Sequence, residues 1–433
     1  MTPRPKIYLL SCGFPPFGRG NSITNACVAN YLADFFDVEV ICMEREDGYL
    51  LSYQEDQSLV EDLNPRLDVR RVRAARWWGL NEALYGIGLL PCYFLNWAWS
   101  VWRKRRELIR ERGVIFAVYP VFSDLVVACL LRRQYGYPLL VDFRDDFSGV
   151  MSRGWRKILR GWYRRLEAYV LQQADCITVT TETLKRDLIK RHGLNEKKLK
   201  IVYNIVPEAP TVAPVASPDN VLRVIYAGAI SRIQCPEILL QAYAGLVKRD
   251  PKVPERLRVE IYGPQNRYFR QRMQKHLVEG ATFGGFLPRE ELGVQLARAD
   301  IGFLSLSAPT YAYATPTKLF DYIEWGIPIL AVLPPGASQE LIERFEIGWV
   351  VEPGDVDGLA RCIEELSRKP ELRAHFRANM LDIRDQFRPQ QQARTWRDGL
   401  MELARTEMDL PDEGNESEVP CLDVTGHKVA SMW

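Results

Sequence analysis

The sequence has few residues of the kinds that build metal and disulfide sites. Its nine cysteines are scattered along 433 residues, and no two have the spacing Cys-x-x-Cys. The four histidines do not continue any cysteine pattern. Structural zinc sites and disulfide frameworks need such ligands in clusters. We therefore expect no metal and no other cofactor, and we expect a reducing compartment, the cytoplasm.

An excess of charge of one sign is also missing. The chain carries 57 basic and 55 acidic residues, which gives a formal net charge of +2. Because binding to nucleic acid depends on a basic surface, the overall charge predicts no nucleic-acid partner. With 47% hydrophobic and 26% charged residues, the composition is that of a globular protein of two or three domains.

A secretory signal and an unbroken apolar span are not evident either. Residues 1–6 lead directly into a short apolar run, without the longer hydrophobic segment of a signal peptide. Residues 84–102 are almost uncharged and are followed by four basic residues at 103–106, but two glycines, a proline and an asparagine interrupt them. This pattern leaves three alternatives: contact with an anionic membrane surface, a buried helix with a solvated basic end, or a spanning helix. We expect a cytoplasmic protein that either is free or lies at the inner face of the membrane.

Short apolar runs alternate with helical patterns through both halves of the chain. Strands are predicted at 7–11, 38–43, 114–119, 138–143, 176–180 and 200–203, and then at 221–226, 258–262, 300–306, 327–332 and 349–351. Helical patterns such as 23–35, 124–134, 236–248, 288–298 and 356–367 lie between them. This alternation predicts an α/β protein of two doubly wound, Rossmann-like domains that face each other across a ligand cleft.

Changes in composition suggest the domain boundaries. Residues 207–219 are rich in proline and alanine and predict a linker between a domain at 1–206 and a second domain at 220–388. A last helix at 389–405 is expected to pack back on the first domain. The polar residues 406–433 predict a disordered tail.

The segment 316–332 has the layout of a phosphate-binding helix followed by a buried strand. Pro316 fits the first turn of a helix and Gly326 its end, so the helix N-terminus faces outward. Free N–H groups there favour an anion, and Lys318 in the first turn adds a positive charge. Asp321, one turn later, is within reach of a sugar hydroxyl. The alternative is an ordinary helix in which Lys318 and Asp321 form a weak surface pair.

A glycine-rich turn follows the first strand. Its residues are Gly18, Arg19, Gly20, Asn21 and Ser22. The glycines let backbone amides approach a phosphate, Arg19 adds charge, and Asn21 or Ser22 can cap the next helix. The spacing is neither a dinucleotide fingerprint nor a phosphate loop, so a tight turn without a ligand is the alternative.

An acidic cluster ends the strand at 138–143. It contains Asp142, Arg144, Asp145 and Asp146. Carboxylates at this edge of a parallel sheet point into the ligand crevice, and Arg144 can hold one of them ionised or bind a substrate anion. Structural salt bridges are the alternative.

The second half repeats the arrangement of a glycine after a strand. Gly228 follows the strand at 221–226, and Arg232 precedes the next helix, where it could meet the same diphosphate as Lys318. Gly263 and the segment 283–288 are predicted to be crevice loops whose backbone contacts a base. A solvated arginine is the alternative for Arg232.

Taken in this order, the segments resemble the retaining GT-B glycosyltransferases of family four, also called group 1, over residues 6–405. The motifs that carry the resemblance are Pro-Thr-Lys-Leu-Phe-Asp at 316–321, Asp-Phe-Arg-Asp at 142–145, Asn204 in the hinge and Leu-Pro-Arg-Glu-Glu-Leu at 287–292. The resemblance implies that 1–206 is the acceptor-side domain and that 220–388 binds a nucleotide-sugar.

The resemblance also implies roles for particular residues. The expected catalytic residues are Asp145, Arg144, Lys318 and Arg232; the expected donor-binding residues are Gly18, Arg19, Gly20, Asn21, Ser22, Gly228, Gly263, Pro316, Thr317 and Asp321; Asp142 and Asp146 lie on the acceptor side. Asp321 stands where the family has a ribose-binding glutamate. Three positions depart from the family: Tyr313 for another glutamate, Gln234 near a phosphate-binding basic residue, and Arg144 for a histidine.

The implied function is transfer of a sugar from a nucleotide-sugar to a glycan or lipid-linked acceptor. The resemblance implies retained anomeric configuration and a role in polysaccharide or glycolipid biosynthesis, with an EC 2.4 type of activity. Cations would stabilise the leaving diphosphate, so that no metal is needed. Two alternatives are a catalytically silent binding subunit, suggested by the three departures, and a nucleotide-sugar epimerase.

Overall fold

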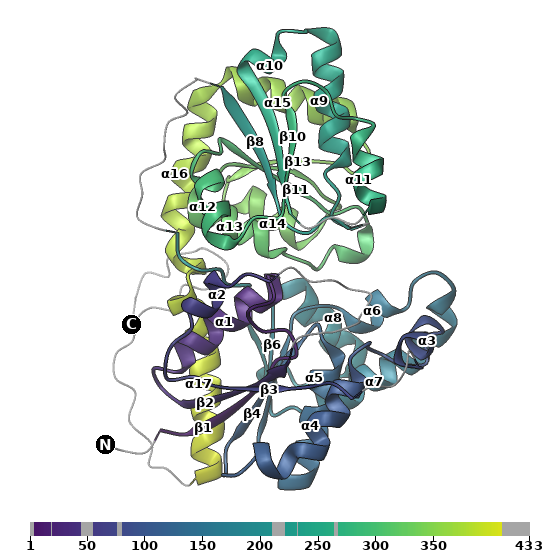
Figure 1. Cartoon of the computed structure of the whole chain (residues 1–433), viewed down its shortest axis with the longest axis vertical. Coiled ribbons are helices and arrows are strands. Elements are labelled where there is room, and N and C mark those ends of the chain that lie inside the picture. The colour runs from purple at the N-terminus through teal and green to yellow at the C-terminus, as the bar shows by residue number, and fades with distance from the viewer. Residues whose placement is uncertain are drawn as a thin grey trace, which may run out of the picture.

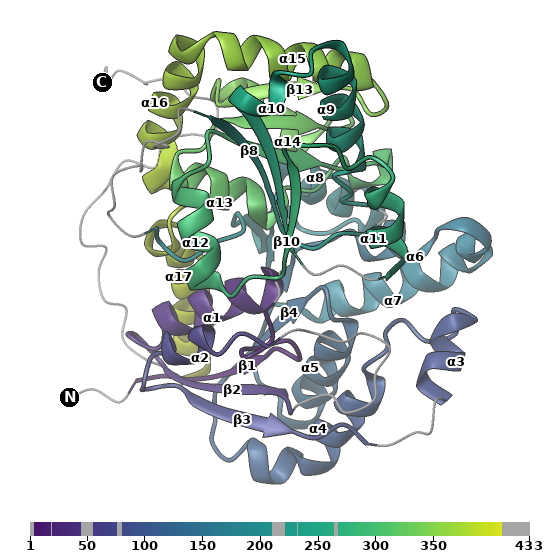
Figure 2. The same cartoon turned by 45° about the horizontal axis from the view of Figure 1, so that its top comes forward.

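The computed structural model describes residues 4–18, 20–44, 55–75, 80–209, 221–231, 233–263 and 267–408. These residues form two α/β domains, one above the other in Figures 1 and 2, which confirms the predicted fold class. Arg19, Arg232, most of the predicted linker and residues 409–433 of the predicted tail lie outside the described residues.

The first domain is built on a parallel sheet. Its strands are β1 (Lys6–Leu10), β2 (Asp37–Met43), β3 (Asp68–Val72), β4 (Val114–Tyr119), β5 (Leu139–Phe143), β6 (Cys176–Val179) and β7 (Leu199–Ile201). Among the described residues the strand order is β3-β2-β1-β4-β5-β6-β7. All six residues of β4 are buried, because helices cover both faces of the sheet. Strand β3 was not predicted, because it is an edge strand whose central arginines are exposed and break the apolar pattern.

Helices surround this sheet on both faces. They are α1 (Gly20–Leu32), α2 (Ser58–Glu61), α3 (Leu80–Gly86), α4 (Leu95–Leu108), α5 (Phe122–Tyr135), α6 (Phe147–Met151), η1 (Gly154–Leu159), α7 (Arg160–Gln173), α8 (Glu182–His192) and η2 (Glu196–Lys198). Trp97 and Val101 of α4 are fully buried, whereas Arg103 and Lys104 are exposed. Within the part of the chain that the structure describes, no helix combines the length and the hydropathy that crossing a membrane requires.

The second domain is built on a second parallel sheet. Its strands are β8 (Leu222–Ala227), β9 (Leu257–Tyr262), β10 (Ala281–Gly285), β11 (Ile301–Ser305), β12 (Ile329–Val332) and β13 (Gly348–Val351), in the order β10-β9-β8-β11-β12-β13. The predicted crevice loop at 283–288 is therefore partly wrong, since Phe283, Gly284 and Gly285 belong to edge strand β10. Its glycines hide the strand pattern: Gly284 lies against Tyr262, where a methyl group would be 2.1 Å from the ring.

The helices of the second domain continue into the last helix of the described chain. They are α9 (Glu237–Arg249), α10 (Val253–Arg256), α11 (Arg267–Gln274), α12 (Arg289–Ala297), η3 (Pro309–Tyr311), α13 (Thr317–Trp325), α14 (Ala337–Arg344), α15 (Val356–Arg368), α16 (Pro370–Phe387) and α17 (Pro389–Met408). Helix α17 lies against α1, β4 and β5 of the first domain (Figure 1). There Trp396 is buried and donates its indole N–H to Thr178 Oγ1 at 2.9 Å.

The strand order of each sheet reverses direction at one point. In the first sheet this point lies between β1 and β4, and in the second between β8 and β11. Loops that follow strands at such switch points form the ligand site of doubly wound proteins. The loops after β1 and β8 lead to Gly20 of α1 and to Gly228, which are both at the domain junction described next.

Candidate active site

Two helix N-termini, those of α1 and α13, meet where the domains touch; we call this place the junction. A methyl group added at Gly20, the first residue of α1, would lie 3.3 Å from Thr317 Oγ1, at the start of α13. Neither helix has an acidic residue in its first turn. Both positive helix ends therefore face the same place without a neutralising carboxylate, which favours an anionic ligand there.

Helix α13 is held in this position by its sequence. Pro316 precedes the helix in an extended conformation and makes no side-chain cap, so it stands one residue before the predicted first turn. Gly326 ends the helix in the left-handed conformation with a φ of 62°, as predicted. The hydroxyl group of Tyr322 accepts from the backbone N–H of Ala227, at the end of β8. These contacts fix the helix N-terminus beside the loop that follows β8.

Lys318 places a buried cation at the junction. Its side chain is only 6% exposed, and its Nζ has no hydrogen-bond partner among the described residues. The ammonium group lies 3.9 Å from the centre of the Tyr226 ring. Burial lowers the pKa of Lys318 to about 7, and the nearby charge of Asp321 opposes this only in part. A buried amine without a partner is costly, so the site is arranged for an anion that is not supplied by the protein.

Gly228 makes room for this lysine. Its φ is 142°, and a methyl group at this position would lie 2.9 Å from Lys318 Cε. Gly263 packs directly on it, because a methyl group there would be 2.0 Å from the carbonyl oxygen of Gly228. The two predicted donor-site glycines therefore lie side by side, and Gly228 contacts the lysine directly.

Further buried polar atoms at the junction lack a partner. Among the described residues, Ser22 Oγ in the first turn of α1 and Thr315 Oγ1 just before α13 make no hydrogen bond. Both side chains are almost fully buried. Since buried hydroxyl groups are normally bonded, these two indicate a ligand that supplies the missing partners.

Arg144 adds a second buried cation from the first domain. Its Nε donates to Asp142 Oδ2 at 2.6 Å and its Nη1 donates to Asn25 Oδ1, on α1, at 2.8 Å. Its Nη2 is buried and has no partner in the described part of the chain. Asp142 is in turn fixed by Thr178, whose Oγ1 donates to Oδ1 at 2.7 Å. Asp142 thus serves to orient Arg144, and one guanidinium donor is left for an external group.

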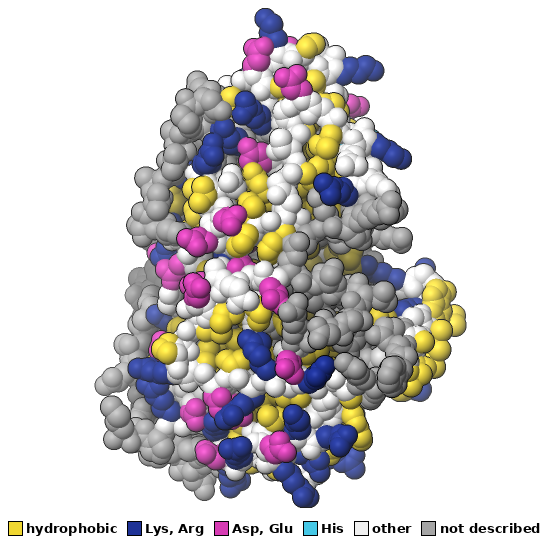
Figure 3. Space-filling view, in the orientation of Figure 1, with side chains coloured by type: hydrophobic (Ala, Val, Ile, Leu, Met, Phe, Trp, Pro, Cys, Tyr) yellow, Lys and Arg dark blue, Asp and Glu magenta, His cyan; other side chains and the backbone are white. Residues whose placement is uncertain are grey.

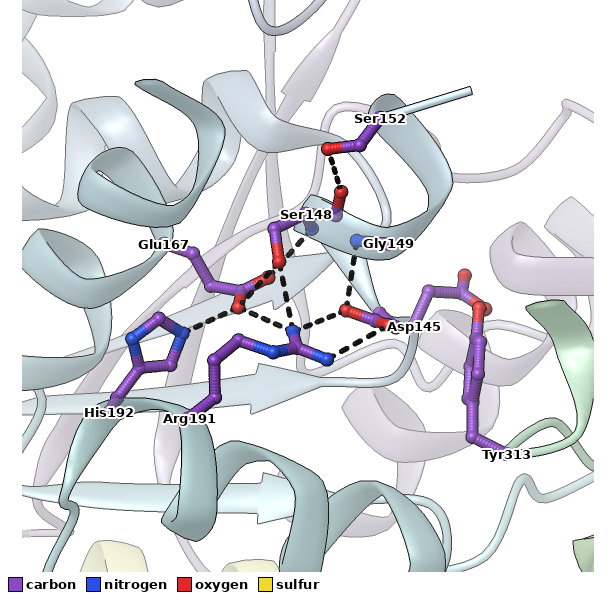
Figure 4. Close-up of polar contacts among 9 residues, drawn as sticks. Asp145, Ser148, Gly149, Ser152, Glu167, Arg191, His192 and Tyr313 are labelled. Atoms are coloured by element: carbon purple, nitrogen blue, oxygen red, sulfur yellow. Dashed lines mark hydrogen bonds and ion pairs between the residues drawn. The ribbon is translucent and has the colours of Figure 1, made fainter. Parts of the chain in front are cut away.

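Asp145 is bonded across the domain junction. The hydroxyl group of Tyr313, in the second domain, donates to Asp145 Oδ1 at 3.1 Å (Figure 4). Burial raises the pKa of Asp145 above its ordinary value, although the Tyr313 hydroxyl and the charge of Arg144 act in the opposite direction. Tyr313 therefore links the second domain to Asp145 of the first domain through its hydroxyl group.

Asp146 is part of a separate ion network, and its partners Arg191, Glu167 and His192 are labelled in Figure 4. Arg191 Nη1 lies 2.6 Å from Asp146 Oδ1 and 2.7 Å from Glu167 Oε1, and His192 Nε2 is 2.6 Å from the same glutamate oxygen. Asp146 also caps α6 by accepting from the N–H of Gly149. Although burial acts to raise it, hydrogen bonding with His192 and the charge of Arg191 hold the pKa of Glu167 below its ordinary value. The network anchors the loop that carries Asp145.

Asp321 pairs with a residue that the sequence analysis did not select. Arg289 Nη2, at the start of α12, lies 2.6 Å from Asp321 Oδ1. The backbone N–H of Arg289 donates to Asp56 Oδ2, in the first domain, at 2.7 Å. Lys318 and Asp321 therefore do not form the surface pair considered as an alternative. Arg289 lies in the motif at 287–292, which was the only signal that could have identified it.

The structure brings most of the predicted residues to one place. Gly20, Ser22, Arg144, Asp145, Gly228, Pro316, Thr317, Lys318 and Asp321 surround the junction, while Asp142 and Asp146 use their carboxylates within the first domain. Gly18 and Asn21 flank the described start of α1. No motif pointed to Asp56 or Thr315, because their roles depend on contacts between domains.

Two protein families match the chain, one for each domain. Residues 21–204 match the family described as "Glycosyl transferase 4-like domain", and residues 211–381 match "Glycosyl transferases group 1". Together they cover most of the chain.

Curated relatives are also glycosyltransferases. The probable glycosyltransferase WbjE of Pseudomonas aeruginosa is 26% identical over 258 residues, which are 55% of this chain and 62% of that protein, so less than two thirds of its length is matched. The D-inositol 3-phosphate glycosyltransferase of Kribbella flavida is 22% identical over 343 residues, 72% of this chain and 75% of that protein.

Solved structures share the fold over nearly the whole chain. Sucrose-phosphate synthase from Thermosynechococcus elongatus has a TM-score of 0.71 at 17% identity. The match covers 93% of this chain and 100% of the synthase chain. Anabaena HepE, solved in complex with UDP-glucose, has a TM-score of 0.66 at 16% identity, with 92% and 100% covered. At such identities the likeness concerns the fold. Together with the two family matches, it shows that this chain belongs to the group 1 glycosyltransferases of the GT-B fold.

Proposed function

We propose that the protein transfers a sugar from a nucleotide-sugar to a glycan or lipid-linked acceptor, with retained anomeric configuration, in polysaccharide or glycolipid biosynthesis. The observation that carries this proposal is the buried, unpartnered ammonium group of Lys318 beside two helix N-termini. A nucleoside diphosphate supplies the missing negative charge. The UDP-glucose complex of the structural relative HepE supports the same class of donor.

In the proposed site, the diphosphate lies between the start of α1 and the start of α13. Lys318 Nζ and the free Nη2 of Arg144 face it from opposite domains, and the hydroxyl groups of Ser22 and Thr315 complete its hydrogen bonds. Arg19 and Arg232, both predicted to add charge, fall outside the described residues. As the bond to the sugar breaks, negative charge grows on the leaving phosphate, and these fixed donors stabilise it without a metal.

Asp321 is the proposed partner of the ribose hydroxyls. Because it also pairs with Arg289, the carboxylate is held in one orientation before the donor binds. Asp145 is the proposed group on the acceptor side. It accepts the hydroxyl proton of the acceptor, or the leaving phosphate does so in its place.

The base of the donor can be found with a thermal-shift screen of the purified chain. UDP, GDP, ADP and dTDP are tested separately, since a ligand that binds the native state alone raises the unfolding temperature. A rise with one nucleotide that is lost in Lys318→Met would support the diphosphate site. No rise with any of the four would contradict it.

The products then separate the proposed transfer from its two alternatives. Release of free nucleoside diphosphate from the matching nucleotide-sugar, increased by an acceptor, supports a transferase. An isomerised nucleotide-sugar formed without an acceptor would indicate an epimerase. Nucleotide binding with neither product would indicate the silent subunit, which the substitution of Tyr313 for a glutamate makes a real alternative.

Contact with an anionic membrane through residues 84–106 is the remaining part of the proposal. The structure leaves Arg103 and Lys104 at the end of α4 exposed, and these basic residues support such contact. The apolar side chains Trp97 and Val101 are buried in the domain and therefore do not take part.

A further inference from the structure

Large apolar side chains are exposed together on one lobe of the first domain. Ile158, on η1, is 82% exposed, and Trp155 and Trp162 beside it are 55% and 47% exposed. Leu80, Ile87 and Leu89, on α3 and the loop after it, are each more than half exposed. We call these six residues the lobe surface. Figure 3 shows apolar and basic side chains mixed at the edge of the molecule where α6 and α7 lie in Figure 1.

Contacts between the two segments make the lobe surface continuous. The hydroxyl group of Tyr163 donates to the carbonyl oxygen of Gly88 at 2.9 Å, and Arg156 Nη2 donates to the carbonyl oxygen of Gly86 at 3.2 Å. The guanidinium group of Arg156 also lies 4.7 Å from the centre of the Tyr85 ring. The loop at 86–89 is therefore fixed to η1 and α7, and their apolar side chains form one face.

The segment that carries Trp155, Ile158 and Trp162 has charge of one sign. Residues 147–166 contain six basic residues and no acidic one. Lys157, Arg160, Arg164 and Arg165 are all exposed. Apolar and aromatic side chains surrounded by basic residues are typical of protein segments that lie in the interface of an anionic membrane.

We propose that the lobe surface docks the protein on an anionic lipid bilayer. Trp155, Ile158 and Trp162 enter the headgroup region, and Lys157 and Arg160 lie against the negatively charged headgroups. Charge complementarity favours a bilayer, because these flanking charges are all positive and the apolar anchors stand outward from the domain. The apolar side chains that enter the bilayer therefore belong to η1 and α7, and not to the buried helix α4.

Docking in this way brings the acceptor side of the junction close to the membrane. Arg153, immediately before η1, stacks on Tyr311 of the second domain, with its guanidinium carbon 4.1 Å from the ring centre. Tyr311 and Tyr313 are neighbours, with ring centres 6.3 Å apart, and Tyr313 is bonded to Asp145. A membrane-bound acceptor would therefore meet Asp145 from the side of the lobe surface.

The test is flotation of the full chain with phosphatidylcholine vesicles and with vesicles containing about one third phosphatidylglycerol. We expect binding to the anionic vesicles, a loss of about 30-fold in Lys157→Gln/Arg160→Gln, and a similar loss in Ile158→Ser/Trp162→Ser. Lys248→Gln/Arg249→Gln, at exposed positions of α9 in the second domain, is the matched charge control, and Val294→Ser, at a 57% exposed position of the same domain, is the apolar control. Both controls should bind like the unmodified chain.

Each remaining outcome overturns the proposal. These are no binding of the unmodified chain to anionic vesicles, loss of binding in Lys248→Gln/Arg249→Gln, and full binding of Ile158→Ser/Trp162→Ser. The unfolding temperature of each variant is measured as a check of folding. No nucleotide is present in the assay, so the result is independent of the proposed transfer.

Discussion

At the scale of single residues, the charge state of Lys318 is the property most open to measurement. In the free protein its pKa is about 7, so the amine is mostly neutral at pH 8. A bound diphosphate favours the ammonium form, so binding must take up a proton above pH 7. We expect the affinity for the nucleotide found in the screen to fall by up to about tenfold per pH unit between pH 7.5 and 9. Titration calorimetry in buffers of different ionisation enthalpy measures both effects.

In Lys318→Met both the nucleotide binding and the proton uptake should be lost, whereas the exposed Lys248→Met should behave like the unmodified chain. An affinity that stays constant from pH 7 to 9 in the unmodified chain would contradict the assigned role.

The same pKa predicts how stability depends on pH. In the unfolded chain a lysine keeps its proton up to about pH 10.4, so the unfolded state binds more protons than the native state between pH 7 and 10. Stability therefore rises with pH in this window. Lys318→Met should be more stable than the unmodified chain at pH 7 by a few kcal/mol, and the difference should shrink toward pH 10. Urea unfolding at several pH values measures it; a difference that does not depend on pH would contradict the prediction.

Replacing Tyr313 tests whether its hydroxyl group controls the pKa of Asp145. Its hydroxyl group lowers the pKa of the buried carboxyl group, so Tyr313→Phe should raise that pKa further. If Asp145 acts as a carboxylate, the acidic limb of the turnover profile moves to higher pH. Nucleotide affinity should not change. Tyr311→Phe is the control, since its hydroxyl group bonds Arg153 instead of Asp145.

At the scale of secondary structure elements, most of the sheet strands were predictable, and the two that were not, β3 and β10, lie at sheet edges. Central strands such as β4 and β12 are continuous apolar runs because helices bury both of their faces. Edge strands β3 and β10 carry exposed arginines or glycines, so their periodicity is lost. The same limit applies to the site. Lys318 was predictable from the start of α13, whereas Asp56 and Arg289 interact only because two domains meet.

Replacing Gly228 tests whether the turn after β8 holds Lys318 in place. Gly228→Ala forces a side chain into a φ of 142° and against Lys318. We expect a loss of about 1–3 kcal/mol in the free energy of unfolding and a loss of nucleotide binding. Gly245→Ala, in α9 with no neighbour within 4 Å, is the control and should be neutral or slightly stabilising. Unchanged nucleotide affinity in Gly228→Ala would show that the displaced lysine does not bind the phosphates.

At the scale of the whole molecule, side-chain hydrogen bonds hold the two domains together in addition to the chain segments that connect them. Thr181 Oγ1 donates to the carbonyl oxygen of Tyr313 at 2.8 Å, and Asn204 Nδ2 donates to the backbone carbonyl oxygen of Thr315 at 2.8 Å. Helix α17 adds the largest connection, since it follows the second domain in sequence and packs on the first.

Replacing Trp396 tests how much α17 contributes to the stability of the first domain. Trp396→Ala removes a fully buried indole from the first domain and should lower the free energy of unfolding by about 3–5 kcal/mol. Hydrogen exchange should increase in β4 and β5, far away in sequence. Trp99→Ala, at a 47% exposed position, should change stability by less than about 0.5 kcal/mol. Exchange that increases only in the second domain would contradict this account.

The position of α17 also affects how the protein is made. Residues 4–206 are translated first, but the face of β4 and β5 that Trp396 covers remains open until residues near 408 have left the ribosome. The first domain therefore reaches its complete core only after the second domain has been synthesised. During translation, the apolar surface of the nascent first domain needs protection, and a ribosome paused between the domains would present it to chaperones.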